Sequence, residues 1–145
     1  MKPTRARELV VIGVIGVVLV YVLLIWTYRS LPRLPRTGPL SIFVIGLLEL
    51  ETANITRHRM AGRAGTKPIA AITVARLAAL AKASSLTGAL LAGCWAALLI
   101  YTAVHWNQFA TAGADLVTAS LGLAASAILT AGALLLERVC RVRKR

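Results

Sequence analysis

A run of about 20 residues without a charged side chain, from Leu9 to Tyr28, constrains the fold of this chain most strongly. Wound as an α-helix, the run is ~30 Å long and matches the hydrocarbon core of a bilayer. Its many Val and Ile residues would favour a strand in water, but in lipid the backbone must satisfy its own hydrogen bonds. We therefore expect a retained membrane-spanning helix. A signal peptide is disfavoured because Trp26 and Arg29 stand where a small-residue cleavage site would be needed.

Three further apolar stretches follow, and 58% of the 145 residues are hydrophobic. This pattern predicts an all-α membrane protein, a single multi-pass membrane domain over 1–145 with four transmembrane helices in an up-down bundle. The spans are expected at about 9–28, 38–56, 77–104 and 116–136, with a basic cytoplasmic loop at 57–68 and a basic C-terminal tail at 137–145. The third helix can begin near Ile69 and extend into the cytoplasmic interface, and Asp115 is placed to cap the fourth helix.

The charge pattern predicts the orientation. The chain carries 17 Lys and Arg against 5 Asp and Glu, and only Arg29, Arg33 and Arg36 lie in the expected first and third loops. The positive-inside rule then places both termini in the cytoplasm of a plasma-membrane protein. Anionic lipid headgroups are the expected contacts of the clustered basic residues Arg57, Arg59, Arg63, Lys67, Arg76, Arg141, Arg143, Lys144 and Arg145. Nucleic acid is not an expected partner, because the chain is only 6% aromatic and has no base-stacking platform.

The second span contains acidic residues. Its fully apolar part, Leu40 to Leu48, is too short to cross a bilayer, so a crossing helix must include Glu49 and Glu51. Glu49 would then lie near the bilayer middle or in its inner half, where a carboxylate needs a partner or has a functional use. We expect an ion pair between Glu49 and Lys82 across the seam of the second and third helices. Two alternatives remain open: Lys82 extends to the headgroups, or the second segment lies at the interface with both acids at the surface.

Small residues recur at helical spacing and predict close helix packing, because hydrophobicity gives little drive for association within lipid. The candidate packing positions are Gly46, Ala53, Ser85, Gly88, Ala89, Gly93, Gly122 and Ser126. At the membrane face opposite the basic loops, Trp26, Tyr28, Tyr101 and Trp106 are expected to form an interfacial aromatic belt.

The segment from Ala75 to Gly88 carries a family resemblance. With the basic N-terminus before the first span and the later Tyr101, its pattern of Arg76, Lys82, Ser84 and Ser85 resembles an actinobacterial family known as domain of unknown function 3180. The resemblance implies a small four-helix integral membrane protein of a bacterial plasma membrane. It implies no catalytic or binding residues, because the family has none assigned.

The residues do not indicate catalysis, a cofactor or a metal: His58 and His105 are predicted on opposite sides, and no catalytic set of Ser, His and Asp is apparent. We therefore expect a protein that is not an enzyme, and foremost a structural or interaction subunit or assembly factor. Its expected partners are the bilayer and other membrane helices or further copies of itself. The alternatives are a small transporter or ion-coupling protein using Glu49 and Lys82, and a membrane sensor of anionic lipid.

Overall fold

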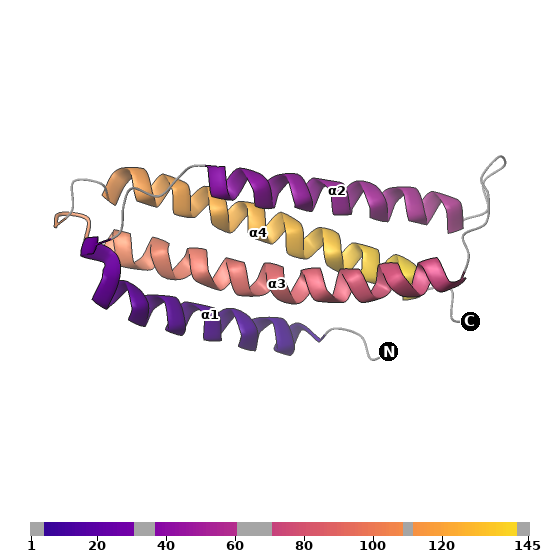
Figure 1. Cartoon of the computed structure of the whole chain (residues 1–145), viewed down its shortest axis with the longest axis horizontal. Coiled ribbons are helices and arrows are strands. Elements are labelled where there is room, and N and C mark those ends of the chain that lie inside the picture. Colours follow the sequence, from indigo (N-terminus) through magenta and orange to yellow (C-terminus); the bar gives the residue numbers. More distant parts are fainter. Residues whose placement is uncertain (1–4, 31–36, 61–70, 109–111, 142–145) are drawn as a thin grey trace.

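The computed structural model describes residues 5–30, 37–60, 71–108 and 112–141, which contain four long helices and one short 3₁₀ turn. The helices are α1 (Ala6–Thr27), α2 (Thr37–Met60), α3 (Ala71–Val104) and α4 (Ala112–Arg141), and the turn η1 (Tyr28–Ser30) continues α1. Each long helix has the length and the apolar composition to cross a membrane. Successive helices run in opposite directions (Figure 1). The predicted class, an all-α membrane protein with up-down helices, is confirmed.

Helix boundaries differ from the expectation at several places; α4, for example, continues to Arg141, within the stretch expected as the basic tail. The sequence predicts Asp115 as the N-cap of α4, whereas the helix begins at Ala112 and Asp115 lies in its first turn. A carboxylate at that position still faces the positive end of the helix dipole. The helix α2 also continues through Arg57 and Arg59, which the sequence analysis assigns to the basic loop. Cations in a last helical turn face the negative end of the dipole, and this favours the longer helix.

The pair α3 and α4 forms the centre of the molecule, with α1 packed on α3 and α2 packed on α4 (Figure 1). The seam of the second and third helices, across which the Glu49–Lys82 pair is expected, is not the chief contact of α2, because α2 packs mainly on α4. The reason is a matched pair of glycines. A Cβ at Gly46 would lie 3.0 Å from the Leu129 nitrogen, and one at Gly132 would lie 3.2 Å from the Gly46 carbonyl oxygen. Without side chains at these two positions, the backbones of α2 and α4 approach closely.

The outer helices are displaced along the molecule in opposite directions (Figure 1). We name its two ends the basic end, where α1 and α3 begin, and the aromatic end, where they finish. At the aromatic end α1, η1, α3 and α4 share a core made of Leu24, Tyr28, Leu98, Tyr101 and Ala119. At the basic end α2, α3 and α4 share a second core made of Ala53, Ala81, Leu136 and Cys140. Thus α1 and α2 each complete a three-helix core, at opposite ends of the central pair.

Hydroxyl groups fill much of the space within the central pair. Thr102, Thr118, Ser85 and Ser126 are among the largest fully buried side chains. Each hydroxyl donates to a carbonyl of its own helix, as Ser126 does to Gly122 at 2.8 Å and Thr102 to Leu98 at 2.8 Å. A hydroxyl that is satisfied in this way behaves as a small packing group and leaves no polar atom without a partner.

Candidate functional site

Glu49 is the buried acid at the junction of three helices. Its side chain is only 8% exposed, and it lies on the face of α2 that also carries Gly46 and Ala53. The carboxyl group shares a side-chain hydrogen bond with Ser84 of α3. Within the described residues, Oε2 of Glu49 has no hydrogen-bond partner. A buried carboxylate with one partner and one unsatisfied oxygen is costly. Glu49 is therefore the side chain in the central region that most needs a further polar partner.

The structure does not bring Glu49 and Lys82 into an ion pair. Ser84 occupies the position beside the carboxyl group, and Lys82 is partly exposed on another face of α3. The separation follows from helix geometry, because residues two apart on a helix point ~200° apart around its axis. Glu51 is separated from Glu49 in the same way and is exposed. The two acids therefore face different directions.

The packing of α1 on α3 shows at which level Glu49 lies. A Cβ at Gly13 of α1 would meet the Ala89 carbonyl oxygen of α3 at 3.4 Å. The two helices run in the same direction, and Ser84 precedes Ala89 by as many residues as Glu8 precedes Gly13 (Figure 1). At ~1.5 Å per residue in both helices, Ser84 and its partner Glu49 lie level with the charged first turn of α1. Glu49 thus lies toward the basic end, buried on a helix, α2, that has the length and composition of a span.

The candidate packing glycines face neighbouring helices inside this chain. A Cβ at Gly93 would collide with the backbone of Gly13, and one at Gly122 would collide with the ring of Trp95. A Cβ at Gly88 would lie 3.2 Å from the Thr130 nitrogen. The other candidates, Ala53, Ser85, Ala89 and Ser126, are buried as well. The small-residue faces are thus occupied by the protein's own helices.

A second polar contact, which the sequence analysis missed, lies at the aromatic end. The Tyr28 hydroxyl donates a 2.8 Å hydrogen bond to Oδ2 of Asp115, and both side chains are buried. This bond ties the end of the first span to the start of the fourth. Its signal in the sequence is a tyrosine and an acid that flank spans on the same predicted side, and the acid has no Lys or Arg near it in the sequence.

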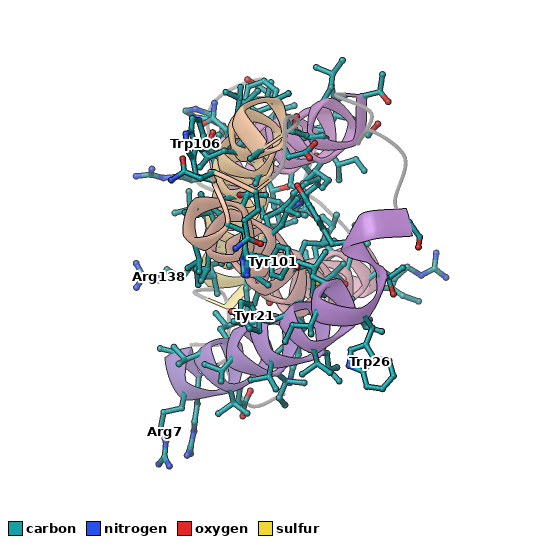
Figure 2. All side chains as sticks on the ribbon, turned by 90° about the vertical axis from the view of Figure 1, so that its left-hand side faces the viewer. Arg7, Tyr21, Trp26, Tyr101, Trp106 and Arg138 are labelled. Atoms are coloured by element: carbon teal, nitrogen blue, oxygen red, sulfur yellow. The ribbon has the colours of Figure 1, made fainter. Side chains whose placement is uncertain are left out.

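Aromatic rings surround this contact. Tyr101 packs edge-on against Tyr21 at 5.9 Å between centroids, lies 4.9 Å from Tyr28, and stacks on His105 at 4.4 Å. Figure 2 shows Tyr21 and Tyr101 close together and Trp26 pointing outward, and Trp106 is about half exposed. The expected belt therefore consists of two kinds of residue: exposed tryptophans at the surface, and tyrosines that form the core of this end.

The described basic residues predicted to contact lipid lie at the basic end. Arg57, Arg59 and Arg76 are exposed on α2 and α3, and Arg141 is the last residue of α4. The other five predicted contacts lie outside the described residues: Arg63, Lys67, Arg143, Lys144 and Arg145. No three His, Cys, Asp or Glu side chains of the described residues form a group able to hold a metal ion.

The four long apolar helices of the described residues define a multi-pass membrane protein with an open helix arrangement. The sequence model of the family described as protein of unknown function (DUF3180) matches residues 9–144, and the chain belongs to that family. The suspected resemblance is therefore confirmed over nearly the whole chain. Neither the curated proteins nor the solved structures contain a match.

Proposed function

We propose that this protein is a structural or interaction subunit of a larger membrane assembly, and that it acts without catalysing a reaction. The observation that carries this proposal is the open packing of the outer helices. In the most apolar 18-residue stretch of each helix, 11% of the residues of α1 and 22% of those of α2 are buried, compared with 44% in α4. Each outer helix therefore presents most of its circumference to the bilayer, where lipid or another helix can cover it.

The exposed face of α1 is the better candidate contact. It extends about halfway around the helix and carries large apolar side chains at Val14, Val18 and Leu23, each about half exposed or more. The opposite face is closed by the backbone contact between Gly13 and Gly93. A partner would therefore bind without displacing α1 from α3. Because the small-residue faces are used internally, such a partner packs against branched side chains.

Adjacent leucines on α1 provide the experiment. Leu23 is 61% exposed, whereas Leu24 is buried in the core at the aromatic end. A photoreactive amino acid replacing Leu23 is expected to give a discrete adduct with another membrane protein or a second copy of the chain. The same replacement at Leu24 should react only within the chain. Adducts with lipid alone from Leu23, and from the exposed Leu47 on α2, would contradict an interaction role.

The ion-coupling alternative has weaker support. Its motive is a carboxylate inside the membrane, but Glu49 lies level with the charged first turn of α1 and hydrogen-bonds with Ser84. Lys82, the second group it requires, does not pair with Glu49. The interaction role needs neither condition, since it rests on the exposed faces of the outer helices.

A further inference from the structure

We propose that the basic end of the α1–α3 seam binds the phosphate headgroup of an anionic phospholipid, through Arg5 and Lys82 with Arg7 beside them. This site is independent of the proposed interaction role, because it uses neither the exposed centre of α1 nor a protein partner. Three features support the site. The two cations lie at the same height along α1 and α3, they occupy the helix faces that meet in the seam, and a hollow beside them changes from polar to apolar.

The level comes from the close contact between the helices. Gly13 of α1 lies against Ala89 and Gly93 of α3, and both helices run in the same direction. Arg5 precedes Gly13, and Lys82 precedes Ala89, each by about two helical turns, or ~10–12 Å. The two cations therefore lie at nearly the same height, immediately before the apolar run that begins at Leu9.

The two cations also lie on the sides of α1 and α3 that meet in the seam. Lys82 lies about two turns before Ala89, so it is on the face of α3 that packs against α1, and it is partly buried there. Arg5 lies about three turns before Gly16, whose Cβ position would be 2.9 Å from the Leu90 carbonyl oxygen of α3. Both cations thus lie at the basic end of the α1–α3 seam. Within the described residues, neither forms an ion pair, and the acid nearest to Arg5 in the sequence is Glu8.

The third feature is a hollow of about 410 Å³ on the surface of α1, lined by Arg5, Arg7, Glu8, Val11 and Ile12. Its lining passes from two guanidinium groups and the one carboxylate of Glu8 to two branched apolar side chains within two turns. Figure 2 shows Arg7 extending away from the helices at this place. A phosphate accepts charge-assisted hydrogen bonds from arginine, and an acyl chain fits the apolar part. A ligand with both parts, situated at the border of a spanning helix, is a phospholipid.

The experiment compares two pairs of substitutions that remove the same charge. The full chain in mild detergent is titrated with phosphatidylglycerol, and bound lipid is counted by native mass spectrometry. Arg5→Gln with Lys82→Gln is expected to weaken binding about tenfold or more, since each cation near a lipid surface contributes measurably. Arg29→Gln with Arg138→Gln, on η1 and α4 and outside the α1–α3 seam, should leave affinity within about twofold. Helix content measured by circular dichroism checks that each variant is folded.

Three outcomes would overturn the proposal. Equal weakening by both pairs would show a diffuse charge effect without a site. Equal binding of phosphatidylcholine would show that the anionic headgroup is not recognised. Displacement of the lipid by inorganic phosphate at equal concentration would show a site for free phosphate. A variant that keeps every charge, Val11→Ser, should lower lipid affinity if the acyl chain uses the hollow, and unchanged affinity would count against the apolar half.

Discussion

Single glycines decide how closely these helices approach. At Gly93 a methyl group would meet the carbonyl oxygen, the carbonyl carbon and the Cα of Gly13, all of them backbone atoms. A flexible side chain can turn away from a new neighbour, but backbone cannot without moving the whole of α1. Gly38, near the start of α2, has nothing within 4 Å of its Cβ position and is the natural control.

Gly93→Ala is expected to lower the free energy of unfolding by about 1–3 kcal/mol, because an overpacked contact forces the two helices apart. Gly38→Ala should be close to neutral. Unfolding of the reconstituted protein by a denaturing detergent, followed by circular dichroism, measures both. If the two variants were equally stable, the backbone contact between α1 and α3 would not hold the helices together.

At the residue scale, the sequence predicts which positions must be small, but it does not predict which side chain contacts which. The small positions Gly46, Gly88 and Gly93 stand out because lipid-embedded helices need close backbone contact. Opposite charge and similar depth predict Lys82 as the partner of Glu49, and the structure shows Ser84 instead. Depth can be counted along a helix, but the rotation of one helix against another depends on all their contacts together.

At the scale of elements, the Tyr28–Asp115 hydrogen bond links two helices that are not neighbours in the sequence. Tyr28 belongs to the turn after α1, and Asp115 lies in the first turn of α4. The main neighbour of α1 is α3, so this bond adds a direct tie to α4 at the aromatic end. Burial makes such a bond to a carboxylate stronger than an exposed one.

A double-mutant cycle measures this tie. Tyr28→Phe removes the hydroxyl with little change in shape, and Asp115→Asn removes the charge. We expect each single variant to be destabilised and the double variant to lose less than the sum, with a coupling of about 1–3 kcal/mol. Additive losses in denaturing-detergent titrations would mean that the two side chains do not stabilise each other.

At the scale of the whole molecule, the structure is a central antiparallel pair with one further helix at each side. A closed bundle would place α1 and α2 in contact, whereas here each completes a different core. The start of α1 and the end of α4 lie at the same end of the molecule (Figure 1). The exposed Arg57, Arg59, Arg76 and Arg138 gather at that end too. This arrangement supports the prediction that both termini and these arginines lie on the same side of the membrane.

A reporter fused after Arg145 tests that orientation. Because the basic end is expected to face the cytoplasm, a reporter that works only in the cytoplasm should be active there, and one that needs export should be silent. A fusion truncated after Ser30, beyond the first span, should give the reverse pattern. Activity of the exported reporter after Arg145 would show that the chain is inserted the other way round.

The sequence alone determined that this is a membrane protein of four helices, and approximately where each of them lies. The reason is that lipid leaves the backbone no partner except its own helix, so that length and apolarity suffice. Only the tertiary structure decided that α2 packs chiefly on α4, that Glu49 meets Ser84, and that Tyr28 reaches Asp115. Small-residue faces occur on α2, α3 and α4 alike and permit several pairings. The choice among them depends on how well whole surfaces fit, and no single stretch of sequence contains that information.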